Sequence, residues 1–484
     1  MSIVTELDLL KYRRTKIVAT VGPASNDPAR LRELIEAGVN VFRVNMSHGA
    51  HEEHALAIER IRAAAAELDS HTAILADLCG PKIRTGHFAD GPVTLSAGSR
   101  VTITTADVPG SKAVIPSQYS AITQDVAPGH PILLNDGAVE LRADSVAAEE
   151  IQCTVIAGGV VGDHKGINLP GSEVSAPSLT DKDRLDAAFA LAQDVDFLAL
   201  SFVRRAEDVI ELRRLVEDAG KRTQIVAKIE KPEALRNSEE ILHHTDAIMV
   251  ARGDLGVELN PEQVPLAQTQ LINRARELNR PVIVATQMLE SMITNARPTR
   301  AEVSDVAFAV ACSADAVMLS GESAVGEFPV EAVAMMDKVA RQTESYYWHT
   351  GHHHVFAAPT HHGDGIPFGD AIADATAKLV AEVKARAVIV ISQNGTTAAT
   401  ISAARPAAPV VAISNQEETC RCMSLMWGMV PHLDAAAGRE NPNQIARRIA
   451  SEIKLAETGD FIVMVRGFHA DPQLNTPSIT LLQL

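Results

Sequence analysis

Eight short runs of apolar, mostly β-branched residues recur along the first two thirds of the chain, and helical patterns separate them. They occupy residues 15–21, 39–44, 72–76, 196–200, 224–227, 247–251, 281–285 and 316–319. Strands that are apolar throughout are buried on both faces, and their strict alternation with helices is typical of a parallel sheet. Eight such strands predict an α/β fold built on a (β/α)8 TIM barrel.

The regular spacing is interrupted once, between the third and the fourth strand. Residues 80–175 contain alternating strands joined by Asp-Gly and Gly-Gly turns, which is the pattern of a small all-β domain or β-barrel. A domain inserted into a βα loop sits above the catalytic face of a barrel and can close over it. We therefore expect this insert to act as a lid.

The chain has 484 residues, which is too many for one ordinary core. We expect residues 1–79 and 176–345 to form the barrel. Residues 346–367, rich in His, Gly and Pro, are expected to be a linker. Further apolar strands alternate with helices beyond it, so residues 368–484 are predicted to form a separate C-terminal α/β domain.

Composition narrows the range of partners. The chain carries 44 basic and 61 acidic residues, a formal charge of −17, and this excess argues against a nucleic-acid or anionic-membrane surface. The N-terminus has no apolar core of signal-peptide length, and no run is long enough to span a membrane. The five cysteines form no CxxC pair, which fits a reducing compartment. We expect a cytoplasmic protein.

The ends of the fifth and sixth strands carry the strongest chemical signal. Lys228 and Glu230 follow the fifth strand, and Arg252 and Asp254 follow the sixth. Adjacent strand ends of a parallel barrel lie side by side on its catalytic face, so these groups should converge. Two carboxylates beside one cation suit a hard divalent metal that holds a phosphorylated substrate.

Polar side chains follow nearly every other strand on the same side. Arg43 offers a bidentate fork for phosphate, and Thr286 offers a hydroxyl that can handle a proton, alone or through water. An arginine, a lysine and a metal around one phosphoryl group supply the charge neutralisation that phosphoryl transfer needs. The other polar groups at these ends and at the close of the insert are Asn45, Ser47, Asp77, Lys82, Arg84, Lys165 and Ser320.

The C-terminal domain contains one further candidate site. Its first strand is followed by Ser392-Gln393-Asn394-Gly395-Thr396-Thr397, which leads into a helix. Hydroxyls and a glycine at a helix N-terminus suit a phosphate group. An ordinary capped turn explains the same residues equally well.

Several of these segments together resemble the pyruvate kinase family. They are residues 15–20, 45–49, 80–86, 165–171, 227–231, 249–258, 285–292 and 318–323, of which 228–230 and 285–292 are the most specific. The resemblance implies transfer of the phosphoryl group of phosphoenolpyruvate to ADP, giving pyruvate and ATP. It implies Mg2+ as the cofactor, with Mn2+ as a substitute.

The resemblance also implies a role for each site residue. Lys228 would stabilise the phosphoryl group in flight, while Glu230 and Asp254 would ligate the metal. The substrate would be held by Arg43, Lys228, Ser320, Thr286 and the backbone amides of Gly253 and Asp254. The nucleotide would be held by Arg84, Lys165, Asn45 and His48. Thr286 stands where the enolate receives its proton, and a water relay is expected because its hydroxyl is a weak acid.

The sequence departs from the common pattern of the family at the monovalent-cation site. Potassium-dependent members bind the ion at positions matching Asn45, Ser47, Asp77 and the backbone oxygen of Leu78. They usually carry Thr where Leu78 stands and Glu where Lys82 stands. The Leu and Lys combination resembles the branch that works without potassium, since an ammonium group near the phosphates can replace the ion. We therefore predict potassium-independent activity.

The resemblance leaves the effector open and implies an assembly. Ser392, Asn394, Gly395, Thr396 and Thr397 match the effector phosphate loop of the family. Thr396 stands where effector-binding relatives often carry a basic residue, so a sugar monophosphate or a nucleotide remains to be decided. The family is usually tetrameric, and a homotetramer is expected.

Two other functions fit part of the pattern. A barrel lyase that uses Mg2+ with pyruvate or oxaloacetate would need Glu230 and Asp254, but neither the insert with Lys165 nor Lys228 aimed at a phosphoryl group. A non-catalytic metabolite sensor would predict a decayed site, whereas Arg43 and Thr286 are present. Nucleotide binding separates these alternatives.

Overall fold

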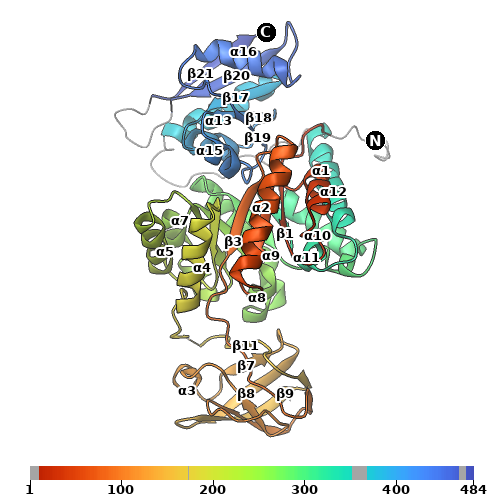
Figure 1. Ribbon diagram of the computed structural model, residues 1–484, viewed down its shortest axis with the longest axis vertical. Helices are drawn as coiled ribbons and strands as arrows, with labels where there is room; N and C mark the ends of the chain where they lie inside the picture. The colour runs from red at the N-terminus through yellow and green to blue at the C-terminus, as the bar shows by residue number, and fades with distance from the viewer. Residues whose placement is uncertain (1–9, 173, 351–367, 468–475) are drawn as a thin grey trace.

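Eight parallel strands close into a barrel in the computed structural model, which describes residues 10–172, 174–350, 368–467 and 476–484 (Figure 1). Their order around the barrel is β1-β16-β15-β14-β13-β12-β3-β2. The strands are β1 (Lys16–Thr20), β2 (Val41–Asn45), β3 (Ala73–Asp77), β12 (Phe197–Leu200), β13 (Gln224–Ile229), β14 (Ala247–Ala251), β15 (Val282–Ala285) and β16 (Ala316–Leu319). The predicted (β/α)8 barrel is confirmed.

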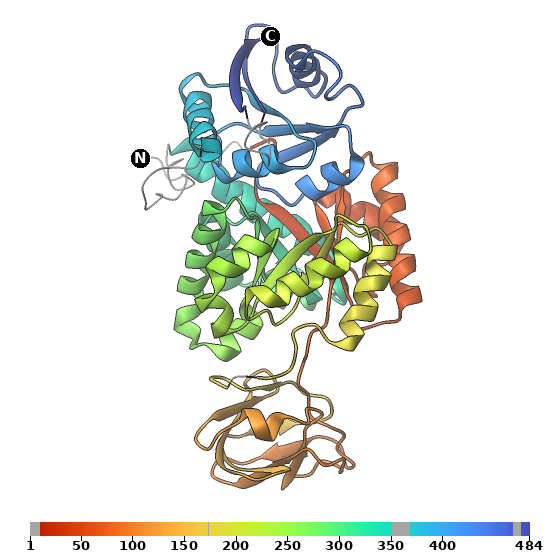
Figure 2. The same cartoon turned by 90° about the vertical axis from the view of Figure 1, so that its left-hand side faces the viewer.

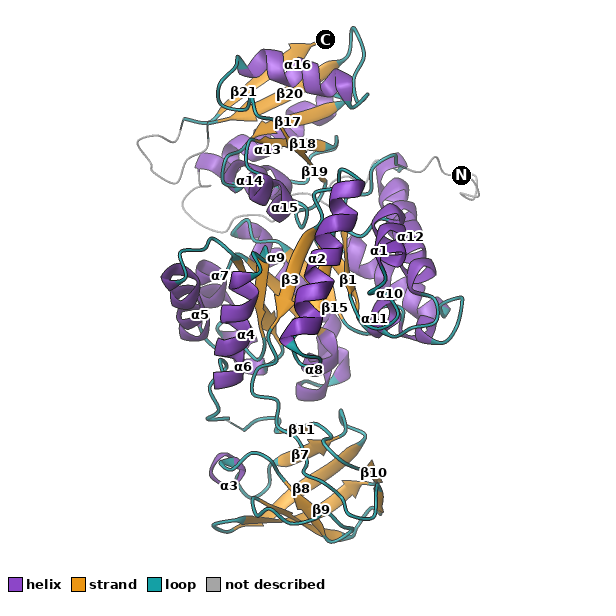
Figure 3. Ribbon diagram, viewed as in Figure 1, coloured by secondary structure: helices purple, strands orange, loops and turns teal. Residues whose placement is uncertain are grey.

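Helices surround the barrel, and the strands are buried on both faces as their composition predicts (Figure 3). One core fills the barrel interior with side chains such as Val18, Ala199 and Met249. A larger core lies between the strands and the helices. The helices are α1 (Pro28–Ala37), α2 (His51–Glu67), α4 (Asp181–Ala192), α5 (Ala206–Asp218), α6 (Pro232–Arg236), α7 (Ser238–His244), α8 (Arg252–Glu258), α9 (Val264–Glu277), α10 (Arg300–Ala311), α11 (Gly321–Ala324) and α12 (Pro329–His349), with 3-10 turns at Pro261–Gln263 and Glu290–Ile293.

The insert is an all-β unit with its own core, and two chain segments join it to the barrel (Figure 2). One sheet has the order β11-β7-β8-β9-β5-β6, and a second pairs β10 with β4. The strands are β4 (Val93–Leu95), β5 (Arg100–Thr104), β6 (Val114–Pro116), β7 (Pro131–Leu134), β8 (Val139–Val146), β9 (Glu150–Ala157), β10 (Gly159–Val161) and β11 (Ile167–Asn168), and α3 spans Ile122–Asp125. The insert lies beyond the carboxyl ends of the barrel strands.

The C-terminal α/β unit lies at the opposite end of the barrel (Figure 1). Its sheet has the order β19-β18-β17-β20-β21, with β21 antiparallel to β20, and a core packs on each face. Its elements are α13 (Phe368–Glu382), β17 (Ala387–Ile391), α14 (Thr396–Ala403), β18 (Val410–Ser414), α15 (Glu417–Met423), β19 (Met429–Leu433), α16 (Pro442–Glu452), β20 (Phe461–Arg466) and β21 (Ser478–Gln483).

The predicted linker begins later than expected. Helix α12 continues to His349, so residues 346–349 are helical. Residues 351–367 of the linker lie outside the described residues. Within the described ranges, no helix is both long and apolar enough to cross a bilayer.

Buried charges join the C-terminal unit to the start of the barrel strands. Asp315, just before β16, accepts hydrogen bonds from Arg405 at 2.9 Å and from the Trp427 amide at 3.1 Å. Asp196, just before β12, accepts one from Arg421 at 2.7 Å. Ion pairs this deeply buried are costly to break, because one partner is then left as an uncompensated charge.

Lys16 is a further buried titratable group at this junction, and it predicts a pH dependence of stability. Its Nζ donates to the Met429 carbonyl at 2.5 Å. Burial, and after it the charge of Arg13, lowers the pKa of Lys16 to about 7. The unfolded chain therefore binds one more proton than the folded chain between about pH 7 and the ordinary lysine pKa, so stability rises with pH in that window.

Replacing Lys16 with methionine is expected to remove this rise. Between pH 7 and pH 9 the wild-type protein should gain about 2 kcal/mol from this residue, and Lys16→Met should lack that gain. Chemical denaturation of both proteins at several pH values measures the difference. Parallel pH profiles for the two proteins would show that Lys16 is protonated in the folded state throughout.

Candidate active site

Lys228 lies on β13, where its backbone pairs with Met249 of the neighbouring strand β14. Oxygen atoms surround its ammonium group. Lys228 Nζ lies 3.0 Å from Glu230 Oε1 and 3.3 Å from Asp77 Oδ1, and it donates to Ser201 Oγ at 2.8 Å. Asp77 and Glu230 are each 1% exposed. The ends of β3, β12 and β13 thus converge on one buried cation.

Asp77 is the centre of this network. Its Oδ2 accepts from Arg43 Nε at 2.6 Å, while its Oδ1 faces Lys228. Arg43 also donates to Thr20 Oγ1 at 3.1 Å. One carboxylate therefore fixes both cations, and it fixes them at the mouth of the barrel, where an anionic substrate would meet them together.

The charges in the network set one another's protonation. Burial raises the pKa of Asp77, but the charges of Lys228 and Arg43 outweigh it and hold that pKa below its ordinary value. Burial likewise lowers the pKa of Lys228, but Asp77 and Glu230 outweigh it and raise the pKa. Lys228 is therefore a permanent ammonium ion at neutral pH.

Glu230 differs from Asp77 because a second carboxylate acts on it. Burial raises the pKa of Glu230, Lys228 opposes that effect, and the charge of Asp254 adds to it. Glu230 Oε2 accepts from the Phe202 amide at 2.8 Å, which fixes the orientation of the carboxylate. Glu230 and Asp254 are two carboxylates that repel each other at the mouth of the barrel. Their oxygens are the kind of donor that a hard divalent cation prefers.

Thr286 follows β15 in a strained conformation. Its φ of 68° is left-handed, which is unfavourable for a β-branched residue, and Gln287 after it has a φ of 54°. Thr286 Oγ1 accepts from the Gly253 amide at 2.7 Å. A Cβ at Gly253 would lie 3.3 Å from that oxygen, so glycine is what allows this close approach.

Arg252 braces the same strained segment. It donates to Asp305 Oδ1 at 2.6 Å and to the Thr286 carbonyl at 2.8 Å. From the sequence, Arg252 is expected only to lie at the end of the sixth strand, with no predicted role. The Arg252 side chain is 9% exposed, and its guanidinium supports the backbone of Thr286.

Three of the four oxygens predicted to bind a monovalent cation, those of Asn45, Asp77 and Leu78, have partners within the protein. Asn45 Oδ1 accepts from the Ser47 amide at 3.2 Å, and the Leu78 carbonyl accepts from Ser201 Oγ at 2.7 Å. Asp77 is engaged by Arg43 and Lys228, as described above. Two protein cations, Arg43 and Lys228, thus already neutralise the charge of Asp77.

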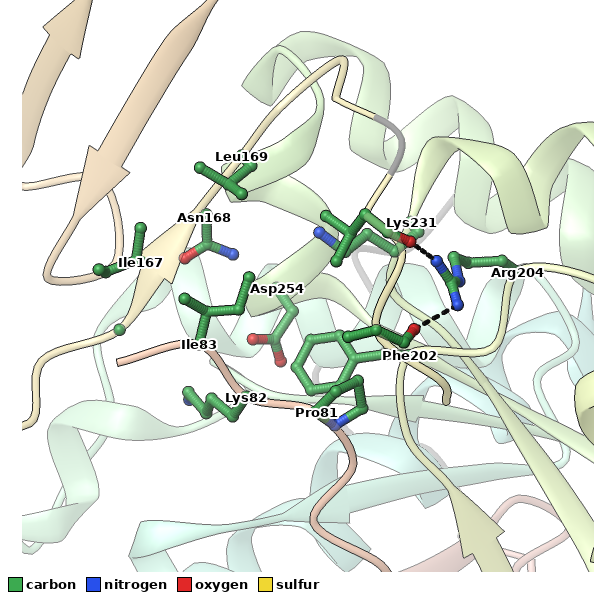
Figure 4. A pocket seen from close by; sticks show the side chains of 13 residues that line it. Pro81, Lys82, Ile83, Ile167, Asn168, Leu169, Phe202, Arg204, Lys231 and Asp254 are labelled. Atoms are coloured by element: carbon green, nitrogen blue, oxygen red, sulfur yellow. Dashed lines mark hydrogen bonds between the residues drawn. The ribbon is translucent and has the colours of Figure 1, made fainter. Parts of the chain in front are cut away.

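A cleft separates the barrel mouth from the insert (Figure 4). Asp254 and Lys231 line it from the barrel, Lys82 from the first connecting segment, and Asn168 from the second. Asn168 Nδ2 donates to Glu258 Oε1 at 3.3 Å across the cleft, and Lys231 Nζ lies 2.5 Å from the same oxygen. Arg204 holds the second segment by donating to the carbonyls of Val174 and Ala176.

The residues predicted to bind the nucleotide come from the barrel and from the segments that join the insert to it. Arg84 donates to the His164 carbonyl at 3.0 Å and forms a β-bridge with Gly166, so it lies where the two connecting segments meet. Lys165 and His48 are exposed, on the insert side and the barrel side respectively. Ser320, at the end of β16, is held by its backbone amide, which donates to Glu322 Oε2 at 2.8 Å.

The loop after β17 borders a second cavity, in the C-terminal unit. Gly395 has a left-handed φ of 86°, and the Thr396 amide donates to Asn394 Oδ1 at 3.2 Å, which is a capped turn. Ser392 Oγ is buried without a hydrogen-bond partner among the described residues. Arg222 and Arg466 line the cavity beside Asn394 and Thr397. These two arginines supply the positive charge that the loop itself lacks.

Comparison with known proteins identifies the family. The family model described as "Pyruvate kinase, barrel domain" matches residues 12–333, and that described as "Pyruvate kinase, alpha/beta domain" matches residues 370–480. The chain belongs to the pyruvate kinase family.

Relatives of this family match along nearly the whole chain. A pyruvate kinase of Agrobacterium vitis is 45% identical over 463 residues, covering 94% of this chain and 95% of the relative. One of Geobacillus stearothermophilus is 42% identical over 462 residues, covering 94% and 78% respectively. A crystal structure of a pyruvate kinase from Cryptosporidium parvum superposes with a TM-score of 0.90 at 36% identity, covering 98% of both chains.

The reaction of the family is therefore that of this chain. It is a phosphotransferase whose substrates are phosphoenolpyruvate and ADP and whose products are pyruvate and ATP, the last step of glycolysis. Pyruvate kinases generally depend on Mg2+. The lyase and sensor alternatives are not favoured.

Proposed function

We propose that Lys228 is the catalytic cation of the phosphoryl transfer, with Arg43 as its partner. The observation that carries this proposal is the enclosure of Lys228 Nζ by Glu230 and Asp77 at 3.0 and 3.3 Å. A fixed ammonium aimed at the point where charge develops stabilises the transition state without reorganising when the reaction occurs. Arg43, held on Asp77, would bind the substrate phosphate through its remaining N–H groups.

Glu230 and Asp254 would hold Mg2+, or Mn2+ in its place. Among the described residues, no group of three or more His, Cys, Asp and Glu side chains is placed to bind a metal. Mg2+ usually takes one or two carboxylates from the protein and completes its shell with water and substrate phosphates. When bound, the ion would neutralise charge on the transferred phosphoryl group.

The neighbouring strand ends would orient the substrate. The Gly253 and Asp254 amides, at the start of α8, with Thr286 and Ser320, would hold the carboxylate of phosphoenolpyruvate, as a helix N-terminus favours an anion. For this, the Gly253 amide must exchange its bond with Thr286 Oγ1 for one with the substrate. The Thr286 hydroxyl donates to the Ala285 carbonyl at 2.6 Å. It would have to release that bond to pass a proton to the enolate through water.

The insert would deliver and cover the nucleotide. Arg84 and Lys165 lie on the two connecting segments, and Asn45 and His48 lie at and just after the end of β2 on the barrel. Closure of the cleft would bring these groups onto the phosphates of ADP and exclude water from the reaction. We propose the division into barrel (1–79 and 176–349), lid (80–175) and C-terminal domain (368–484), with the linker confined to the residues between α12 and α13.

The remaining proposals concern regulation, assembly and location. A sugar monophosphate or nucleotide would bind Ser392, Asn394, Gly395, Thr396 and Thr397, assisted by Arg222 and Arg466 from the walls of that cavity. A homotetramer is proposed from the family. All five cysteines are unpaired thiols, which supports a reducing, cytoplasmic location.

We expect the protein to be active without potassium. The assay that measures this also tests the proposed function. Pyruvate formation from phosphoenolpyruvate, ADP and Mg2+ is measured in tetramethylammonium buffer and again with added K+. Full activity in both is expected, because protein cations already neutralise Asp77. Lys82→Glu together with Leu78→Thr should make the rate depend on K+.

Two other results of this assay have clear meanings. A wild-type rate that appears only after K+ is added would keep the kinase assignment and refute the role given to Lys82. Absence of pyruvate in either buffer from folded protein, with candidate sugar phosphates supplied, would refute the assignment itself.

A further inference from the structure

A cavity of about 550 Å3 lies where the segment before β1 meets the C-terminal unit, and we call it the junction cavity. Its walls include residues 10–12 and Arg14, Trp348 of α12, the end of α13, residues 407–409, and Lys454 with Leu455. Because residues 10–14 precede β1, the cavity lies at the end of the barrel opposite the active site. Its volume is in the range of small-molecule binding sites.

The charge of the junction cavity is opposite to that of the protein. Its described lining residues include no acidic side chain but five basic ones, Lys11, Arg14, Lys384, Arg386 and Lys454. Arg386 is partly neutralised by Asp460 at 3.6 Å. Among the described ion pairs, none involves Lys11, Lys384 or Lys454. In a chain of formal charge −17, cations gathered in one concave site attract an anion.

Arg14 supplies a buried donor without a partner. It is 5% exposed, and its Nη1 has no hydrogen-bond partner among the described residues. Its Nη2 donates to the Ala407 carbonyl at 3.3 Å, which anchors the guanidinium in the wall. A buried N–H group left unsatisfied is destabilising, and an anion in the cavity would satisfy it.

Lys384 and Lys454 are placed in the cavity wall at a conformational cost. They follow α13 and α16 with left-handed φ values of 53° and 56°. Glycine or a short polar residue is usual at this position, as at Asp69, Asp194 and Asn279 in this chain. The helix C-terminus attracts any cation, but both lysines also line the same cavity, which capping alone does not explain.

We propose that the junction cavity binds a small phosphorylated anion through Lys384, Lys454 and Arg14. The site is separate from the loop at residues 392–397, whose cavity is lined by different residues. The walls come from both the barrel side and the C-terminal unit, so the bound anion links the two units. This is a further ligand site, independent of the roles proposed for the active site.

The tryptophans provide a local signal for binding. The chain has two tryptophans. Trp348 lines the junction cavity, and Trp427 lines a small neighbouring cavity that also contains Arg14. Titration of the full-length protein with inorganic pyrophosphate in Mg2+-free buffer, followed by tryptophan fluorescence and calorimetry, therefore reports on this site. A saturable change in tryptophan emission is expected.

The decisive variant is Lys384→Gly with Lys454→Gly. Glycine suits both left-handed positions, so the fold and the basal pyruvate-forming activity should be retained while two charges are removed. The affinity for pyrophosphate measured by fluorescence should fall at least about tenfold, because each lost charge-assisted hydrogen bond contributes more than a neutral one. Lys378→Ala, on α13 outside the cavity, and Thr397→Val, in the 392–397 loop, should leave that affinity unchanged.

Three results would overturn the proposal. The first is a wild-type protein whose tryptophan emission does not respond to pyrophosphate. The second is a double glycine variant that binds as tightly as the wild type, which would leave helix capping as the role of the two lysines. The third is loss of the fluorescence response in Thr397→Val, which would place the bound anion at the loop.

Discussion

Lys228→Ala is expected to lower kcat by about a thousandfold or more while leaving the affinity for phosphoenolpyruvate within a few fold. Removing a single preorganised donor to a developing charge typically costs 10²–10³ in rate, and Lys228 carries a full charge held by Asp77 and Glu230. Its effect falls on the transition state more than on the bound substrate. Initial rates of pyruvate formation give kcat and KM separately.

Two controls separate chemistry from structure in this experiment. Lys228→Arg keeps the charge but moves it, so it should recover part of the rate. Direct titration of phosphoenolpyruvate shows whether Lys228→Ala still folds, since Asp77 and Glu230 lose their shared counter-charge. If affinity fell and turnover held, Lys228 would be a binding residue only.

Glu230→Gln is expected to weaken divalent metal binding by about 10- to 100-fold and to lower activity accordingly at fixed Mg2+. The amide removes one of the two carboxylate charges at this strand mouth, and hard cations bind carboxylates far better than amides. Mn2+ titration monitored by electron paramagnetic resonance gives the affinity directly. Activity as a function of Mg2+ concentration gives the consequence for catalysis.

Glu258→Gln is the matched control for this change. Glu258 is a buried carboxylate on α8 that pairs with Lys231 and Asn168 at the edge of the same cleft. It should leave metal affinity unchanged, although it loosens the contact with the insert. Equal losses in the two variants would mean that general electrostatics of the cleft, and not ligation by Glu230, hold the metal.

The sequence by itself determined the fold and the centre of the site. The barrel strands are local patterns, because a strand buried on both faces must be apolar whatever surrounds it. Lys228 and Glu230 belong to one strand end, so their proximity needs no tertiary information. Asp254 could be added because neighbouring strands of a parallel barrel end on the same face.

Only the tertiary structure decided how the charges are paired. Asp77 lies on β3 and Lys228 lies on β13. Only β12, which follows the insert in sequence, lies between these two strands in the barrel, so the two side chains can pair. No local pattern shows that Asp77 pairs with two cations or that Arg252 supports the backbone of Thr286.

The junction cavity depends on tertiary structure still more. Arg14 lies hundreds of residues before Lys384 and Lys454, and the two lysines follow different helices, α13 and α16. No local pattern marks any of the three as a ligand-binding residue. Their common feature is a cavity that exists only when the segment before β1 meets the C-terminal unit. Local patterns determine elements, because burial and backbone preference act over a few residues. Long-range charge pairing follows from how those elements are packed.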